Sequence, residues 1–122
     1  MNKKQLQLVT FEQAKRLKAL GFDWSAYNFY DATQDNLLCL NPLVCFVSNH
    51  NKSKTKISAP TVALALKWFS DVKKIRHSVQ INNGYYGFIS GEDLWESKDF
   101  STYESAESAL LDELLTILEK EQ

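Results

Sequence analysis

Apolar and polar positions alternate with helical spacing over residues 11–20, where every third residue is apolar. The run Thr10-Phe11-Glu12-Gln13 has the form of a capping box and marks where this helix begins. Gly21 then stands where a left-handed residue commonly ends a helix, and Phe22 can fold back onto Leu17. The pattern therefore predicts a helix over residues 11–20.

Two further segments carry helical patterns. The segment 59–73 is apolar around most of its circumference, with Ser58 as the expected N-cap and Pro60 in the first turn. A helix of this kind is buried on more than one side. The segment 102–119 has a broad leucine-rich face and follows Ser101-Thr102-Tyr103-Glu104, which has the form of a second capping box. We expect the core of the protein to include Leu66, Phe69 and Leu114.

Other segments favour strands. Residues 76–81 alternate with period two, Asn82-Asn83-Gly84 is a turn sequence, and residues 85–89 are again typical of a strand. These features predict a β-hairpin. The segments 26–30 and 43–47 are rich in aromatic and β-branched residues, which predicts strands but does not fix their register.

The order of these elements, α-β-β-α-β-β-α, predicts an α+β fold in which a small antiparallel sheet is packed by three helices. The 122 residues and the 44% hydrophobic content are those of a single domain, residues 1–122. Residues 48–57 are almost entirely polar, and we expect them to form a mobile loop.

The composition indicates a soluble protein without export or membrane signals. Apolar stretches fall short of the roughly 18 residues that a spanning helix needs, and no apolar segment follows the N-terminal lysines. We therefore expect a cytoplasmic location. In that reducing compartment, Cys39 and Cys45 are expected to act as small apolar side chains without forming a disulfide.

Charge is distributed unevenly along the chain. Residues 1–91 hold 12 Lys/Arg and 5 Asp/Glu, a net +7, whereas residues 92–122 hold 2 and 10, a net −8. Two interpretations follow. The basic part presents a face to an anionic partner, or the acidic C-terminal helix docks on that face and neutralises it. The second interpretation needs no partner, and we favour it.

Several runs of the sequence resemble a known group of proteins. These are Ser58-Ala59-Pro60-Thr61, Lys67-Trp68-Phe69, Phe100-Ser101-Thr102-Tyr103-Glu104-Ser105-Ala106 and the helix ending Gly21-Phe22-Asp23. Over residues 10–23 and 58–120 the chain is similar to short uncharacterised proteins of Bacteroidetes phages, prophages and mobile elements. The resemblance implies a shared fold, a phage or mobile-element origin and a location in the bacterial host cytoplasm. It implies no catalytic residue.

The sequence gives little sign of catalytic, cofactor-binding or metal-binding motifs. No nucleophile elbow, phosphate-binding loop, dinucleotide fingerprint or zinc-protease motif occurs. Cys39, Cys45, His50 and His77 would be enough ligands for zinc, but their spacing is not that of a zinc site. The carboxylates Glu92, Asp93, Glu96 and Asp99 lack the spacing of a calcium loop. We expect no catalytic, cofactor-binding or metal-binding residues, and a non-enzymatic protein.

Two binding functions remain. The first is a small protein-binding module or homodimer that uses Trp68, Leu111 and Leu115 as its partner surface, since the two longer helices carry more apolar surface than one core obviously needs. A helix sandwiched inside the fold would explain the same pattern. The alternative is single-stranded nucleic-acid binding through the strand Tyr85–Phe88 and basic groups. Its candidate contacts are Lys15, Arg16, Lys73, Lys74, Arg76 and Tyr86. The sequence pI of about 6.1 argues against this alternative.

Overall fold

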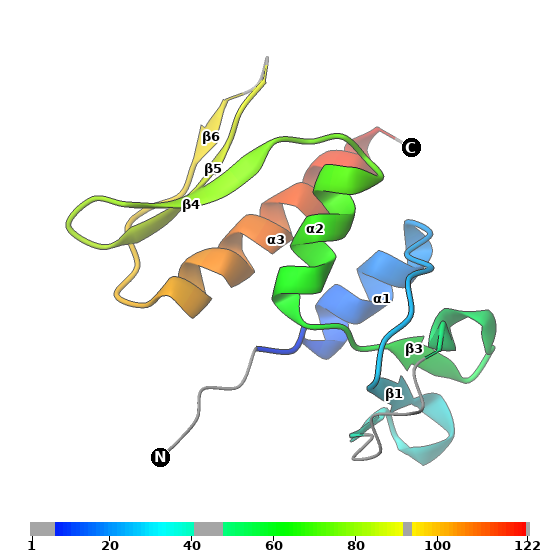
Figure 1. The fold of residues 1–122 in the computed structure, drawn as a ribbon. Coiled ribbons are helices and arrows are strands. Elements are labelled where there is room, and N and C mark those ends of the chain that lie inside the picture. The colour runs from blue at the N-terminus through cyan, green and yellow to red at the C-terminus, as the bar shows by residue number, and fades with distance from the viewer. Residues whose placement is uncertain (1–6, 41–47, 92–93, 122) are drawn as a thin grey trace. The chain divides into compact units, whose positions relative to one another are not determined.

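A computed structural model describes residues 7–40, 48–91 and 94–121 of the chain (Figure 1). The fold class is α+β, and the described residues form three α-helices and two three-stranded antiparallel sheets. The predicted class and the predicted order of elements are confirmed, and the structure adds a third strand to each strand pair.

The chain divides into two compact units, which we describe separately. Leu8–Thr61 form the N-terminal unit, and Met1–Gln7 together with Val62–Gln122 form the C-terminal unit. The single domain expected from the sequence stays a prediction, because only an unfolding experiment shows whether the two units fold together.

The N-terminal unit begins with helix α1, Phe11–Ala19, as predicted. The capping box forms, because the backbone N–H of Gln13 donates to the Thr10 hydroxyl at 3.1 Å and Thr10 N–H donates to the Gln13 side chain at 2.9 Å. After the helix, Gly21 has a φ of 96°, and Phe22 N–H donates to the Leu17 carbonyl at 3.0 Å. These bonds satisfy the last carbonyls of α1.

The sheet of this unit places β1, Phe29–Asp31, between β2, Leu37–Cys39, and β3, Lys56–Ser58. Both pairings are antiparallel. The predicted strand 26–30 therefore overlaps β1, whereas the predicted strand 43–47 lies outside the described residues. Two short 3₁₀ helices, Ala32–Gln34 and His50–Lys52, join the strands.

The polar segment 48–57 contains regular structure, since one 3₁₀ helix and the start of β3 fall within it. Side chains tie it to other segments of the N-terminal unit. The Lys18 ammonium donates to the carbonyls of Ser53 at 2.8 Å and Lys56 at 2.9 Å. Asn51 donates to the Phe22 carbonyl at 2.9 Å. The mobility of this segment stays a prediction.

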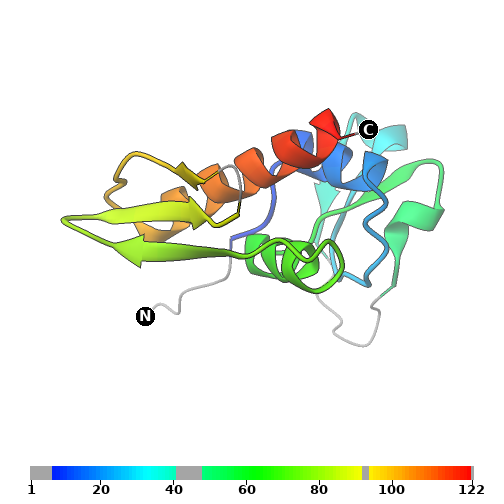
Figure 2. The same ribbon diagram turned by 90° about the horizontal axis from the view of Figure 1, so that it is seen from above.

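The C-terminal unit contains two helices, α2 (Val62–Asp71) and α3 (Tyr103–Lys120), and a sheet in the order β4-β5-β6. Its strands are β4, His77–Ile81, β5, Tyr85–Ile89, and β6, Trp95–Glu96. Helix α3 packs against β5 and β4, and α2 packs against α3 (Figure 2). β4 is the strand nearest to α2 in both views.

The predicted hairpin forms β4 and β5, and its turn lies at Asn82-Asn83-Gly84. Asn83 adopts a φ of 56°, which asparagine tolerates better than most residues. Further along β5, a Cβ atom at Gly87 would lie 3.0 Å from the Cβ of Leu110 and 3.1 Å from the Trp95 ring. Glycine at this position therefore allows α3 to approach the sheet closely.

The predicted starts of two helices are wrong. Helix α2 begins at Val62, because Ser58 instead pairs with Phe29 in the sheet and the Pro60 carbonyl accepts a hydrogen bond from Val9 N–H. The N-cap of α3 is Thr102, whose side chain accepts from Ser105 N–H at 3.1 Å, so the cap lies one residue later than expected.

The expected core residues are buried. Phe69 and Leu114 have no exposed surface, and Leu66 is 6% exposed. The predictions for these three positions are confirmed.

Candidate functional site

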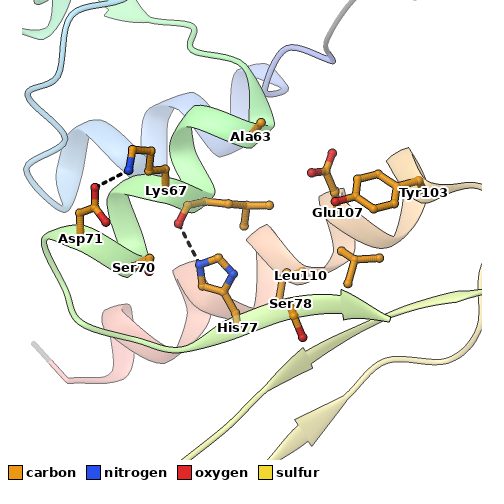
Figure 3. A pocket seen from close by; sticks show the side chains of 11 residues that line it. Ala63, Lys67, Ser70, Asp71, His77, Ser78, Tyr103, Glu107 and Leu110 are labelled. Atoms are coloured by element: carbon orange, nitrogen blue, oxygen red, sulfur yellow. Dashed lines mark hydrogen bonds and ion pairs between the residues drawn. The ribbon is translucent and has the colours of Figure 1, made fainter. Parts of the chain in front are cut away.

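A groove of about 460 Å³ lies within the C-terminal unit, and we call it the α2–β4 groove (Figure 3). One wall comes from α2, the opposite wall from β4, and the floor from α3. The apolar part of the lining consists of Ala63, Leu66, Val79 and Leu110. Polar groups stand at its edges, so the groove offers both kinds of contact that recognition sites commonly combine.

β4 is an edge strand, and the described residues add no strand to its outer side. Ser90 N–H donates to the Arg76 carbonyl at 3.1 Å, and Asn82 N–H donates to the Gly84 carbonyl at 2.7 Å. Along an antiparallel pair, residues that bond to the neighbouring strand alternate with residues that do not. Since Arg76 and Asn82 make such bonds, the even-numbered residues of β4 bond to β5. The backbone groups of His77, Val79 and Ile81 consequently point away from β5.

This free edge belongs to the groove, because His77, Ser78 and Val79 line it. Unpaired N–H and C=O groups along an edge form a template for another strand. Lysine, proline or a covering segment commonly blocks such edges in other proteins. Here the residues of β4 are His77-Ser78-Val79-Gln80-Ile81, which contain neither lysine nor proline.

His77 connects the two walls of the groove. Its Nε2 donates to the Leu66 carbonyl on α2 at 2.8 Å, because a carbonyl oxygen can only accept (Figure 3). Burial lowers the pKa of His77, while the bond to Leu66 acts in the opposite direction and is the smaller effect. The neutral ring therefore holds β4 beside α2.

Two carboxylates of the groove differ in their surroundings. Asp71 forms an ion pair with Lys67 one helical turn away, at 2.8 Å, with both side chains largely exposed. Glu107 on α3 is half-buried, and burial raises its pKa, with a smaller contribution from the negative charge of Glu104. Tyr103 lies beside Glu107, and burial raises the pKa of its hydroxyl. The negative charges of Glu107 and Glu104 raise this pKa further.

The side chains expected to form a partner surface are buried. Trp68 is 1% exposed, and Leu111 and Leu115 have no exposed surface. They do not form an exposed surface in this structure, since their apolar area is already removed from water. The large apolar side chains that do reach the surface of this unit include Ile81 at the end of β4, which is 78% exposed.

The candidate nucleic-acid contacts lie in both units. Lys15 and Arg16 are on α1, and Lys15 pairs with Glu12 at 3.1 Å. Lys73, Lys74 and Arg76 lie between α2 and β4, and Tyr86 lies on β5.

In the C-terminal unit these contacts include groups that already have partners. The Lys73 ammonium stands over the Trp68 ring, 5.2 Å from its centroid. The Tyr86 hydroxyl donates to the Gln80 side chain at 3.0 Å. The face of the sheet that carries Tyr86 also carries Phe88 and Glu96, and a carboxylate is a poor neighbour for a phosphate.

The considered metal ligands do not gather in the described part of the chain. His50 donates to the Ala26 carbonyl in the N-terminal unit at 3.0 Å, whereas His77 lies in the α2–β4 groove. Cys45, Glu92 and Asp93 lie outside the described residues. Within residues 7–40, 48–91 and 94–121, no three His, Cys, Asp or Glu side chains stand close enough to hold a metal ion.

Sequence reasoning did not find the groove. Alternation indicated the β4–β5 hairpin, but it does not say which of two paired strands lies at an edge or which helix lies beside it. The sequence held one signal for the groove, namely that Tyr103 and Glu107 are four residues apart. Residues with this spacing share one face of a helix.

Comparison with known proteins gives no family model that matches the chain, and neither the curated proteins nor the solved structures contain a match. Of the helices in the described residues, none has the length and hydrophobicity needed to span a membrane.

Proposed function

We propose that this protein is a small protein-binding module that receives an extended segment of a partner protein as an added strand along β4. The observation that carries the proposal is the free backbone edge at His77, Val79 and Ile81, whose first two residues line the α2–β4 groove. Main-chain hydrogen bonds to such an edge supply affinity, and the neighbouring pocket supplies specificity.

The length of β4 sets the length of the partner segment. The five residues of β4 span roughly 17 Å at about 3.3 Å per residue, which is the length of a five-residue partner segment. Alternate side chains of that segment would point toward the lining formed by Ala63, Leu66 and Leu110.

In this proposal the protein acts by binding and not by catalysis. In this proposal His77 has a structural role, since the hydrogen bond from its Nε2 to the Leu66 carbonyl joins β4 to α2. We further propose that the protein is a phage-type accessory protein of the bacterial cytoplasm. The support for this part is the sequence resemblance over residues 10–23 and 58–120.

The experiment uses a fluorescein-labelled, end-blocked pentapeptide of sequence Thr–Val–Leu–Val–Thr, whose anisotropy is measured against the full chain. Val79→Pro removes an outward N–H without removing a hydrogen bond between β4 and β5. We expect saturable binding to the wild type and a loss of affinity of about tenfold or more in Val79→Pro. Val79→Thr keeps the N–H and serves as the matched control, with affinity close to that of the wild type.

Other partners would give other results. A concentration-dependent dimer that Val79→Pro dissociates would assign the β4 edge to a second copy of this chain and would overturn the proposed partner. Micromolar binding of a labelled single-stranded oligonucleotide that weakens steeply with salt would instead favour the nucleic-acid function. Equal peptide binding by wild type and Val79→Pro would contradict strand addition.

A further inference from the structure

We infer that the α2–β4 groove selects a partner segment that carries a lysine or arginine, and that Glu107 is the residue that selects it. This inference rests on the proposed function, because it assumes that an extended segment lies along β4. It adds the chemistry of that segment, which the free strand edge alone does not specify.

The position of Glu107 is the first observation. Glu107 lies one turn after Tyr103 on the first half of α3, and both residues line the groove. Figure 3 shows its carboxylate beside the Tyr103 ring, in the space between α2 and α3. When a partner segment lies along β4, a side chain of that segment that enters the groove would therefore approach this carboxylate.

The charge balance of the groove is the second observation. Lys67 is the one ammonium or guanidinium group among the described lining residues, and Asp71 already neutralises it at 2.8 Å. His77 donates its Nε2 hydrogen to a carbonyl, and its lowered pKa favours the neutral ring. Glu107 therefore leaves the lining with one net negative charge, and no cation of the described residues pairs with it.

The burial of Glu107 is the third observation. Its pKa is raised because the half-buried position removes water from the carboxylate, and Glu104 adds a like charge. A carboxylate in this situation gains more from an added cation than an exposed one does, because water screens the pair less. The same charge would repel an acidic partner segment, so the site favours basic segments and disfavours acidic ones.

The apolar lining suits the rest of a basic side chain. The methylene stem of lysine or arginine packs on apolar surface while its charged end reaches a polar group. Ala63, Leu66 and Leu110 provide that surface next to Glu107. A bare inorganic cation would use the carboxylate but neither the apolar lining nor the strand edge, so a peptide is the better match.

The test compares three end-blocked pentapeptides, Thr–Val–X–Val–Thr, in which X is Lys, Leu or Glu. We expect the wild type to bind the Lys peptide about tenfold more tightly than the Glu peptide, with the Leu peptide between them. Glu107→Gln should remove this ranking and still bind the Leu peptide. Glu113→Gln changes a glutamate of α3 that does not line the groove, so it should keep the ranking.

Separate results identify which proposal fails. Equal affinities of the wild type for all three peptides would overturn the role of Glu107 and leave strand addition standing. No binding of any peptide would overturn both. Competition by n-butylammonium as strong as that of the Lys peptide would show a site for free amines and contradict the inference. The unfolding midpoint of Glu107→Gln should not fall, and a lowered midpoint together with a retained ranking would assign Glu107 a structural role only.

Discussion

The two units use their polar side chains differently. In the N-terminal unit, polar side chains bond to the backbone of distant segments of the same unit. Lys18 holds the carbonyls of Ser53 and Lys56, and the Tyr30 hydroxyl donates to the Val9 carbonyl at 2.9 Å. These bonds fix irregular segments that contribute few residues to the core.

In the C-terminal unit, the packing of apolar side chains holds most of the segments together. Residues without exposed surface recur along both helices, and they include Val62, Ala65, Phe69, Leu110 and Leu114. Polar groups of the α2–β4 groove are left without partners among the described residues, namely the outer backbone of β4 and the carboxylate of Glu107. These groups are the reason why the proposed partner segment is placed in the C-terminal unit.

The largest effect should follow from removing a core side chain. Phe69→Ala deletes a ring that has no exposed surface and contacts Trp68 edge to face at 5.1 Å. We expect a loss of about 3–5 kcal/mol in the free energy of unfolding, measured with urea. Val72→Ala, just after α2 and 45% exposed, is the control and should cost less than about 1 kcal/mol. An unchanged midpoint for Phe69→Ala would show that apolar packing does not stabilise this unit.

A smaller effect should follow from removing a polar tie. Lys18→Met keeps the apolar stem of the side chain but loses both bonds to the segment 53–56. We expect a loss of about 1–3 kcal/mol and faster amide hydrogen exchange in residues 53–58. Lys15→Met, on the same helix, loses one exposed ion pair and should cost less than about 1 kcal/mol. Equal effects of the two substitutions would contradict the role given to Lys18.

The helix caps offer a matched pair across the two units. Thr10→Ala and Thr102→Ala each remove a hydroxyl that accepts an N–H at 3.1 Å. Each should cost about 1 kcal/mol in the free energy of unfolding. Because these contacts are local, the two costs should agree within experimental error. A much larger cost for Thr10→Ala would show that polar contacts of the N-terminal unit act as one network.

The smallest effect concerns pH. Burial lowers the pKa of His77 and of His50 below the usual 6.5, so the unfolded chain takes up protons first as pH falls. Stability should therefore be fully present above pH 6.5 and should decline below it until each folded-state pKa is reached.

Variants separate the two histidines. In His77→Gln the side-chain amide can still donate to the Leu66 carbonyl, so the decline should become shallower without a loss of stability at neutral pH. The measurement is urea unfolding at a series of pH values, with His50→Gln as the counterpart in the N-terminal unit. A decline that neither substitution changes would assign it to other groups.

Local signals in the sequence predicted much of the fold. The Thr10 capping box, the ending at Gly21 and the turn Asn82-Asn83-Gly84 each depend on neighbouring residues, and all three form as predicted. The cap of α3 was misplaced by one residue between the neighbouring Ser101 and Thr102, whereas the wrong start of α2 depended on a distant partner. Ser58 has the properties of an N-cap, but its pairing with Phe29 across the sheet takes precedence over that local preference.

The candidate site was less accessible to sequence reasoning for the same physical reason. Trp68 and Leu111 are apolar, and composition alone does not distinguish a residue of an interface from a residue of a buried core. The α2–β4 groove requires that β4 be an edge strand and that α2 lie beside it. Both facts follow from tertiary packing that no spacing in the sequence encodes.

Amide hydrogen exchange of β4 is the most direct test of strand addition. At saturation with the Thr–Val–Lys–Val–Thr peptide, an added strand would accept hydrogen bonds from the outward amides of His77, Val79 and Ile81, while Ser78 and Gln80 already bond to β5. We predict strongly slowed exchange at the odd-numbered amides that the added strand reaches, including that of Val79. The even-numbered amides of β4 should change little. Peptide binding that leaves the exchange of Val79 unchanged would contradict strand addition at β4.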